Sequence, residues 1–259
     1  MDLQLKNRLA LVSGSTAGIG HAIAQSLLRE GARVIINGRT QAAVDAAVAG
    51  LGVGAIGFAG DLASAEGAEA LALAHPDIDI LVNNLGIFEP RAFEDIPDAD
   101  WTRFFDVNVL SGVRLSRQVL PGMKRRNWGR ILFISSESGI QIPAEMIHYG
   151  MTKSAQIAVA RGLAESVAGT GITVNSVLPG PTRSRGVEDF VQTLASESGQ
   201  SFDEFEKAFF EKVRPTSLIK RFATPEEVAS MVVYLCSPLA SATTGAALRV
   251  DGGTVKSAY

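Results

Sequence analysis

The sequence predicts an α/β fold: one doubly wound, mostly parallel sheet of seven strands with helices on both faces. Short, nearly continuous apolar runs alternate with longer segments of helical periodicity, as in chained strand–helix–strand units whose strands are buried on both faces. The chain has 259 residues, 46% of them hydrophobic and 20% charged, so it can bury a large core. No repeat or linker divides it, and we expect a single domain over residues 1–259.

Each strand is predicted from a short apolar or β-branched run between turn signals. These runs are Leu9–Val12, Val34–Asn37, Ala55–Phe58, Ile80–Asn83, Ile131–Ile134, Thr173–Leu178 and Ala247–Val250. The helical segments between and after them are Ile19–Glu30, Gln41–Val48, Ala65–Leu73, Trp101–Met123, Tyr149–Ala168 and Pro225–Leu235. Residues 181–223 interrupt the alternation, and a connection of that length in a compact domain is typical of a functional lid. We expect a substrate lid at about residues 183–222.

Charge and cysteine content exclude several classes of protein. The formal net charge is −3, whereas nucleic-acid binders usually have a basic surplus. Cys236 is the only cysteine, which rules out an intrachain disulfide and suits a reducing compartment. The three histidines show no metal-ligand pattern, and neither a signal peptide nor a membrane span is visible. We expect a cytoplasmic protein with no metal, nucleic-acid or membrane partner.

A glycine-rich turn, Gly14-x-x-x-Gly18-x-Gly20, joins the first predicted strand to the first predicted helix. Lacking Cβ atoms, its glycines allow a tight turn and let backbone N–H groups approach a pyrophosphate, which the helix N-terminus also attracts. A purely structural turn is the alternative, but the position between strand and helix favours a dinucleotide site. The expected contacts are Gly14, Ser15, Thr16, Gly18, Ile19 and Gly20.

The end of the second strand indicates which dinucleotide binds. An NAD site has an acidic residue about 20 residues beyond the glycines to hold the ribose hydroxyl. This sequence has Asn37-Gly38-Arg39-Thr40 there, and Asp45 lies a turn into the next helix. Arg39 can clamp a 2′-phosphate, which predicts NADP(H) over NAD(H); the alternative is a solvated residue at a helix start.

Asp61 and Leu62 follow the third strand, where the adenine should lie. Asp61 can accept a hydrogen bond from the adenine amino group or cap the next helix.

Three features further along predict the catalytic groups. Tyr149 and Lys153 lie four residues apart on one helix face, Ser135-Ser136 follows the fifth strand, and Asn108 lies in the helix after the fourth. A nearby ammonium favours the phenolate, which would bring the tyrosine pKa closer to neutral. A Tyr-x-x-x-Lys pair alone is usually an ordinary helix pair; its coincidence with the glycine turn and the serine favours catalysis.

These motifs resemble those of the short-chain dehydrogenase/reductase family, in its short single-domain branch with Tyr-x-x-x-Lys. The match extends over nearly the whole chain and implies a Rossmann fold. It rests on the glycine turn, Asp61, Asn83-Asn84-Leu85-Gly86, Asn108, Ser136, Tyr149-x-x-x-Lys153, Pro179-Gly180 and Asp251-Gly252-Gly253. The sequence departs from the family at Leu85, where alanine is usual, and at Ser13, where threonine is usual.

The resemblance implies a role for each catalytic candidate. The family's serine lies 13 residues before the tyrosine, which selects Ser136. Tyr149 would donate a proton to the carbonyl oxygen that Ser136 holds, and Lys153 would bind the nicotinamide ribose and lower the tyrosine pKa. Asn108 would help hold a water that relays protons to Lys153. Further cofactor contacts implied are Asn83, Gly86, Lys153, Pro179, Gly180 and Thr182; for the last three the alternative is a stiff strand exit, because Pro181 fixes φ.

The predicted lid carries Phe202, Phe205 and Phe209 at positions i, i+3 and i+7, on one helical face, with Phe190 and Phe210 nearby. This face either packs on the core or covers an apolar substrate. Candidate pocket walls are Glu137, Ser138, Gln141, Ile142 and Met146. His148 should point away from the site, toward the surface or an interface.

The expected function is NADPH-dependent reduction of a ketone, or oxidation of a secondary alcohol. The enzymatic alternative is a 3-oxoacyl-carrier-protein reductase, for which Lys124-Arg125-Arg126 with Arg130 would receive an acidic carrier, although cations also suit a helix C-terminus. The non-enzymatic alternative is an NADP(H)-binding sensor or scaffold, which Tyr149 and Lys153 disfavour. Enoyl reductases space these two residues more widely. The resemblance also implies a homotetramer, with one interface formed by the helices Trp101–Met123 and Tyr149–Ala168.

Overall fold

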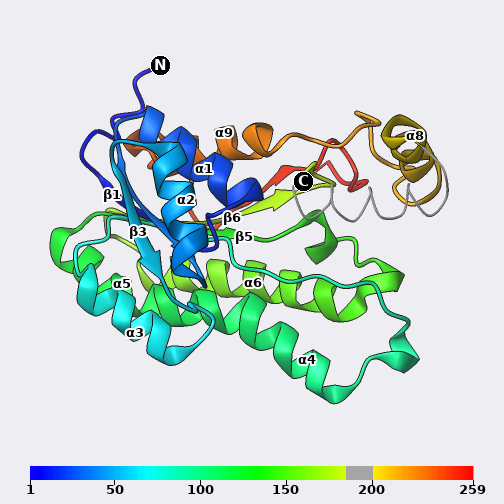
Figure 1. Cartoon of the computed structure of the whole chain (residues 1–259), viewed down its shortest axis with the longest axis horizontal. Helices are drawn as coiled ribbons and strands as arrows, with labels where there is room; N and C mark the ends of the chain where they lie inside the picture. The colour runs from blue at the N-terminus through cyan, green and yellow to red at the C-terminus, as the bar shows by residue number, and fades with distance from the viewer. Residues whose placement is uncertain (185–200, 259) are drawn as a thin grey trace.

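Seven parallel strands form one sheet in the order β3–β2–β1–β4–β5–β6–β7 (Figure 1). A computed structural model describes residues 1–184 and 201–258. The strands are β1 (Leu9–Val12), β2 (Arg33–Gly38), β3 (Ala55–Ala59), β4 (Ile80–Asn83), β5 (Gly129–Ile134), β6 (Ile172–Pro179) and β7 (Ala247–Val250). The predicted fold class is confirmed. Four strands are one or two residues longer than predicted. Backbone hydrogen bonding between strands does not depend on side-chain polarity, so residues outside the apolar runs also pair, as Gly129 does with Ile172.

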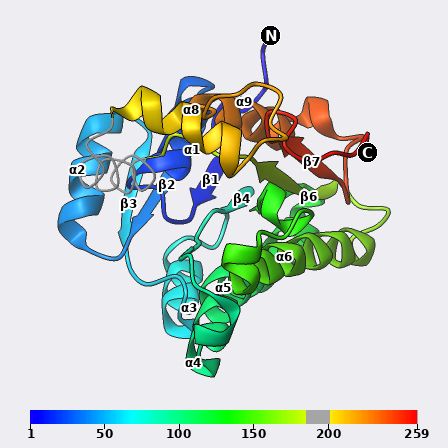
Figure 2. The same cartoon turned by 90° about the vertical axis from the view of Figure 1, so that its right-hand side faces the viewer.

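Helices cover both faces of the sheet in two layers (Figure 2). On one face lie α1 (Gly18–Arg29), α2 (Gln41–Leu51) and α9 (Pro225–Cys236); on the other lie α3 (Ala65–Ala74), α4 (Asp98–Phe105), α5 (Ser111–Arg126) and α6 (Ile147–Ser166). Each layer encloses its own apolar cluster, around Ile23 and Val232 on the first face and around Leu115 and Ala160 on the second. Burial on both faces explains why the strands are nearly continuous apolar runs.

The predicted helix Trp101–Met123 is interrupted. A π-helical turn, Asp106–Leu110, separates α4 from α5. One extra residue per turn re-aims side chains, and such insertions are frequent at functional sites. Here the turn contains Asn108, which is fully buried.

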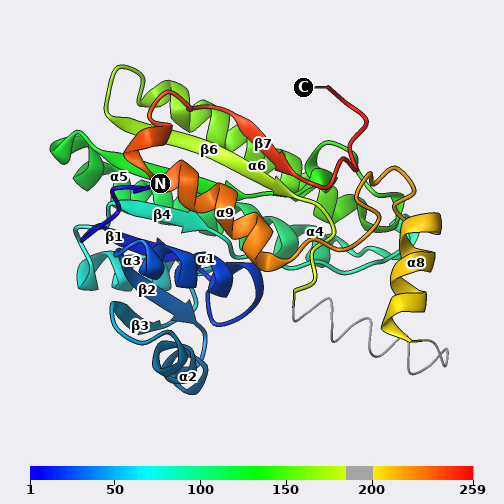
Figure 3. The same cartoon turned by 90° about the horizontal axis from the view of Figure 1, so that it is seen from above.

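The strand order places a topological switch point between β1 and β4. The chain builds β1, β2 and β3 outward in one direction and then returns to pair β4 with the other side of β1. Connections from the two central strands therefore diverge, leaving a crevice at their carboxyl ends where ligands bind. The helix α8 (Phe202–Lys212) lies beyond these carboxyl ends (Figure 3).

Two polar side chains predicted for the surface are buried instead. His148 packs 4.0 Å from Phe104 and 6.0 Å from Trp101 between ring centroids, and burial lowers its pKa. Arg130 on β5 donates to the carbonyls of Gly129, Gly171 and Ser237, so it cannot extend the basic run of residues 124–126. Both predictions were wrong because polarity in the sequence does not show which side chains fold into the interior: Arg130 finds buried acceptors, whereas His148 packs against aromatic rings.

In the part of the chain that the structure describes, no helix combines the length and apolar character needed to cross a bilayer. Among the same residues, no three His, Cys, Asp or Glu side chains are grouped to hold a metal ion.

Candidate active site

A cavity of about 520 Å³ opens at the carboxyl edge of the sheet. Three of the predicted catalytic residues, Ser136, Tyr149 and Lys153, line it together. Ser136 follows β5, while Tyr149 and Lys153 lie one turn apart on α6. The spacing of four residues on a helix thus presents both side chains to one space, as the sequence predicts.

The two adjacent serines have different partners. The Ser135 hydroxyl donates to the Lys153 carbonyl (2.7 Å) and so ties α6 to the end of β5. The Ser136 hydroxyl instead donates to the carboxylate of Glu137 (2.6 Å), within the cavity. Ser135 thus links two elements of the fold, whereas the hydroxyl of Ser136 donates to a neighbouring side chain of the cavity.

Lys153 is held by acceptors other than the phenol. Its Nζ donates to the Ile134 carbonyl (2.9 Å) and to Gln156 Oε1 (3.1 Å), and it lies 5.5 Å from the ring centroid of Tyr149. Burial lowers the pKa of Lys153 to about 7. An amine with this pKa changes its charge near neutral pH.

Tyr149 departs from the expectation that its pKa is lowered. Burial raises the pKa above its ordinary value, while its hydrogen-bond contact with Ser136 and the charge of Arg214 act in the opposite direction. The Lys153 amine, which donates to Ile134 and Gln156, is not among the groups that lower it. The phenol is therefore a protonated acid throughout the neutral range.

Asn108 lies behind the cavity and is bridged to Lys153 by a side chain that the sequence analysis missed. Its Oδ1 accepts from the Ile87 N–H (2.7 Å), and its Nδ2 donates to Thr152 Oγ1 (2.9 Å). Its backbone carbonyl accepts from Gln156 Nε2 (2.6 Å), and Gln156 Oε1 accepts from Lys153. The resemblance implied that Asn108 helps hold a water that relays protons to Lys153; in the structure the Gln156 side chain joins the two residues. The available signal was a polar residue three positions after Lys153, on the same helix face.

Replacement of Gln156 tests this bridge. Gln156→Leu removes an acceptor that favours the ammonium, so the pKa of Lys153 should fall, whereas Gln156→Glu should raise it. We expect the alkaline limb of the pH–kcat/KM profile to move by about one pH unit, toward acid in the first variant and toward base in the second. Unmoved limbs in both variants would show that Gln156 does not set the Lys153 charge.

The glycine turn is fixed by two asparagines from neighbouring strand ends. Asn37 Oδ1 accepts from the Gly14 N–H (3.1 Å), and its Nδ2 donates to the carbonyls of Phe58 and Gly60. Asn84 Nδ2 donates to the carbonyls of Ser13 and Gly14. A Cβ on Gly20 would lie 2.5 Å from Asn84 Nδ2 and 2.6 Å from the Gly14 oxygen, so only glycine fits.

The start of α1 suits an anion. Its N-cap residue, Ala17, has no capping side chain, and its first turn has no acidic residue, whereas Thr40 caps α2 and Ser64 caps α3. The free N–H groups of α1 and its dipole point toward the crevice beside Ile19, which lines the cavity. The glycine turn therefore fits the pyrophosphate of a dinucleotide.

The predicted adenosine contacts lie further along this edge. Arg39 is exposed after β2 and, among the described residues, makes no hydrogen bond or ion pair. Asp61 is exposed and accepts from the Ala63 N–H (3.0 Å), while Ser64 provides the cap of α3. Leu62 is buried in the core, so only its backbone can face a ligand.

The residues of the motif Asn83-Asn84-Leu85-Gly86, at the end of β4, lie partly in the core and partly at the cavity. Asn83 is buried with its Nδ2 toward Ser116 (3.3 Å), and it is Asn84 that lines the cavity. Gly86 also lines it, and a Cβ there would approach Lys153 Nζ to 3.4 Å. Leu85 packs against Gly14 and the core.

Pro179, Gly180 and Thr182 line the cavity from the end of β6. Gly180 is obligatory, since a Cβ would lie 2.6 Å from the Asp251 carbonyl oxygen. The Thr182 hydroxyl donates to the Gly180 carbonyl (2.9 Å).

Three phenylalanines of the predicted lid line the cavity. Phe205 and Phe209 of α8 line it together with Phe222, and Phe209 stands 5.0 Å from Phe222 between centroids. Phe210 is buried, so at this position the side chain packs on the core, which is one of the two expected arrangements. Residues 185–200 of the predicted lid, including Phe190, lie outside the described residues.

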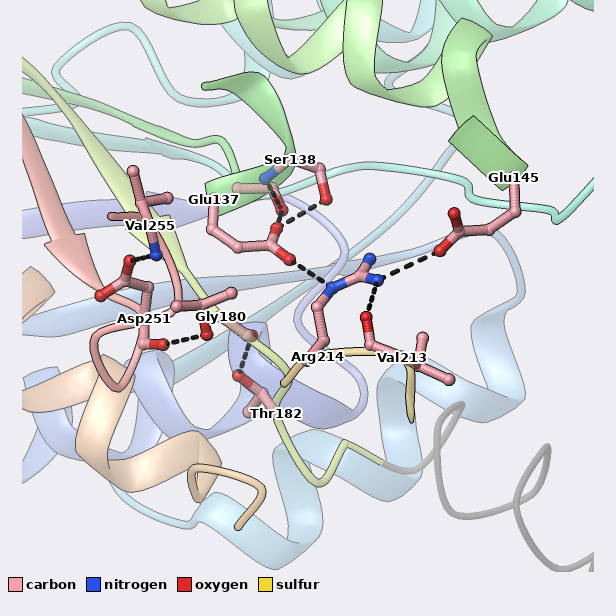
Figure 4. Close-up of polar contacts among 11 residues, drawn as sticks. Glu137, Ser138, Glu145, Gly180, Thr182, Val213, Arg214, Asp251 and Val255 are labelled. Carbon is pink, nitrogen blue, oxygen red and sulfur yellow. Dashed lines mark hydrogen bonds and ion pairs between the residues drawn. The ribbon is translucent and has the colours of Figure 1, made fainter. Parts of the chain in front are cut away.

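Of the predicted pocket walls, Glu137, Ser138 and Met146 line the cavity, whereas Gln141 and Ile142 do not. Arg214, at the end of α8, lines it as well and binds Glu137, a contact that the sequence analysis missed (Figure 4).

Comparisons with known proteins agree with this geometry. A family model described as Enoyl-(Acyl carrier protein) reductase matches residues 14–255. The "Uncharacterized oxidoreductase YvrD" of Bacillus subtilis (strain 168) is 51% identical over 99% of this chain and 100% of its own length. The 3-oxoacyl-(acyl-carrier-protein) reductase FabG of Aquifex aeolicus (strain VF5) is 34% identical over 98% of this chain and 99% of its own.

Among solved structures, L-sorbose reductase from Gluconobacter frateurii, complexed with NADPH and L-sorbose, superposes with a TM-score of 0.93. It is 31% identical, and the match covers 99% of this chain and 100% of that chain. The fold and the site define an oxidoreductase of the Rossmann type. The chain belongs to the short-chain dehydrogenase/reductase family.

Proposed function

We propose that this protein is an NADPH-dependent carbonyl reductase that also oxidises the corresponding secondary alcohol. The observation that carries the proposal is the meeting of Ser136, Tyr149 and Lys153 in one cavity beside the glycine turn. When bound, the reduced nicotinamide supplies a hydride to the carbonyl carbon. The protein contributes position, a proton and electrostatics.

Each residue has a distinct part in this reaction. Tyr149 donates its proton to the carbonyl oxygen, for which burial keeps the phenol protonated. Ser136 donates a hydrogen bond to the same oxygen. Lys153, in its charged form, holds the nicotinamide ribose hydroxyls, and Asn108 with Gln156 positions its amine.

The residues proposed to hold NADP(H) follow the edge of the sheet. The turn from Gly14 to Gly20 with Ser15, Thr16 and Ile19 takes the pyrophosphate, and Arg39 takes the 2′-phosphate. Asp61 and Leu62 border the adenine, and Gly86, Pro179, Gly180 and Thr182 border the nicotinamide half. Asn83 is buried behind this edge, and Asn84 takes its predicted place in the cavity. The NADPH complex of the sorbose reductase supports this choice of cofactor.

The direct test is substrate-dependent loss of NADPH absorbance with a panel of ketones. We expect turnover with wild-type protein and nearly none with Tyr149→Phe. A panel that leaves NADPH unchanged, or equal rates in both proteins, would exclude the proposed reaction.

Arg39→Ala tests the cofactor preference. Loss of a charge-assisted contact with the 2′-phosphate, about 1.5–3 kcal/mol, should raise KM for NADPH by roughly 10- to 100-fold and leave KM for NADH unchanged. Arg33→Ala is the matched control, because Arg33 is exposed at the opposite end of β2. Equal effects of Arg39→Ala on both cofactors would refute the 2′-phosphate contact.

A 3-oxoacyl-carrier-protein reductase is the second candidate, and similarity to the Aquifex reductase favours it. The basic run that would receive a carrier is weaker than the sequence suggests, since Arg130 is buried and Arg126 pairs with Asp77 and Asp79. The homotetramer, the lid and the cytoplasmic location stay predictions.

A further inference from the structure

The cavity contains one buried acidic group directly beside the reactive serine. Glu137 is 4% exposed, and its Oε2 accepts from the Ser136 hydroxyl (2.6 Å). The same oxygen accepts from the Ser138 hydroxyl (2.6 Å; Figure 4). Its Oε1 accepts from Arg214 Nε (3.1 Å). Arg214 Nη1 continues the network to Glu145 Oε1 (3.1 Å) and to the Val213 carbonyl (3.0 Å).

Much of the cavity lining around this network is apolar. It includes Phe88, Met146, Phe205, Phe209, Val213 and Phe222. A carboxylate buried beside such a wall is stable only while donors satisfy its oxygens. A substrate therefore meets one buried carboxylate, that of Glu137, close to the reacting carbonyl, and apolar side chains over much of the remaining lining.

The serine proton cannot serve two acceptors. A carboxylate only accepts, so in the contact between Ser136 and Glu137 the serine must be the donor. In the proposed reaction the same proton turns toward the substrate carbonyl oxygen. Glu137 Oε2 then loses one of its two hydroxyl donors, at a point next to the carbonyl, and a donor on the substrate can replace it.

We propose that Glu137 is a specificity-determining residue that accepts a hydrogen bond from a hydroxyl on the carbon adjacent to the substrate carbonyl. The preferred substrates are then α-hydroxy ketones with an apolar remainder, an inference that rests on the proposed function. The carbonyl carbon accepts the hydride and its oxygen accepts the Tyr149 proton, so the ketone is reduced to a vicinal diol and the nicotinamide is oxidised.

The network also disfavours acidic ketones. The Arg214 guanidinium forms ion pairs with two carboxylates, those of Glu137 and Glu145, so the three groups together carry a net negative charge. A substrate carboxylate placed there would have to compete with both for the guanidinium.

Four phenyl ketones test the proposal, with NADPH as the reductant. 2-Hydroxyacetophenone offers the donor, 2-methoxyacetophenone keeps a similar electron-withdrawing oxygen without it, propiophenone replaces the hydroxyl by methyl, and benzoylformate is anionic. We expect kcat/KM for the hydroxy ketone to exceed that of the methoxy ketone by at least about 10-fold, or about 1.4 kcal/mol, with benzoylformate poorest. Equal values for the three neutral ketones would overturn the inference and leave the proposed function standing. Failure to reduce any ketone would overturn both.

A matched pair of variants assigns the effect to Glu137. Glu137→Gln should bring the hydroxy-to-methoxy ratio close to one, because an amide accepts less strongly and can donate to the methoxy oxygen. Glu145→Gln makes the same change on the other partner of Arg214 and should keep the wild-type ratio. A wild-type ratio in Glu137→Gln would overturn the role of Glu137; if that variant does not fold, the comparison of ketones on wild-type protein still decides.

Discussion

Tyr149→Phe is expected to lower kcat/KM for ketone reduction about 1,000-fold, equivalent to about 4 kcal/mol of transition-state stabilisation. The substitution removes the proton that the carbonyl oxygen must receive. It keeps the ring that meets Phe88 edge-on, with centroids 6.3 Å apart, so the cavity wall is preserved. Affinity for NADPH, measured by fluorescence titration, should be unchanged.

The pH dependence of the wild-type rates is a second test of Tyr149 as the proton donor. Since burial raises the pKa of Tyr149, the phenol stays protonated across neutral pH, so a fall in kcat/KM for reduction between about pH 7 and pH 9 should follow the charge of Lys153 and not that of the tyrosine. Alcohol oxidation needs the phenolate, so its rate should rise with pH over the same interval.

Tyr234→Phe is the control, because Tyr234 is a partly exposed tyrosine on α9 outside the cavity. If Tyr149→Phe retained a rate within tenfold of the wild type while the control was unaffected, another group would have to supply the proton.

Features encoded locally were predictable from the sequence. The glycine turn was predicted from its place between one strand and the next helix. The shared orientation of Tyr149 and Lys153 was predicted from their spacing on a single helix. Both depend on backbone geometry over a few residues, so their placement at the cavity follows once the sheet is parallel.

Features that depend on contacts between distant segments were not predictable. Arg214 meets Glu137 across 77 residues of sequence, and Gln156 meets Asn108 across 48. Likewise, the pKa of Lys153 is lowered by burial, and its amine finds acceptors on β5 and α6, which no spacing rule shows. The π-helical turn at Asn108 also escaped prediction, because the apolar periodicity of a helix continues through one inserted residue.

Lys153→Met is expected to lower kcat/KM about 100- to 1,000-fold and to flatten the pH dependence of cofactor binding. In the wild type the amine is charged below its pKa of about 7 and neutral above it. Anionic NADPH favours the charged form, so binding above about pH 7 takes up a proton and Kd should rise up to tenfold per pH unit. The variant should lack that slope, and a wild-type slope would exclude Lys153 as its source.

The same variant should be more stable than the wild type. The pKa of this lysine falls from an ordinary 10.5 to about 7 on folding, so between these values the unfolded chain binds more protons. The lysine's contribution to the free energy of unfolding therefore rises with pH across that window, and below it the full cost of a buried ammonium is present. Methionine removes this cost, although it also gives up the bonds to Ile134 and Gln156.

We expect Lys153→Met to gain at least about 1 kcal/mol near pH 6, or roughly 2–4 °C in Tm, and the gain to shrink as pH approaches 10. Thermal unfolding of both proteins at several pH values measures this difference directly. A variant that is less stable at acid pH would mean that Ile134, Gln156 and the surrounding dipoles more than compensate the buried charge, and that Lys153 supports the fold as well as the reaction.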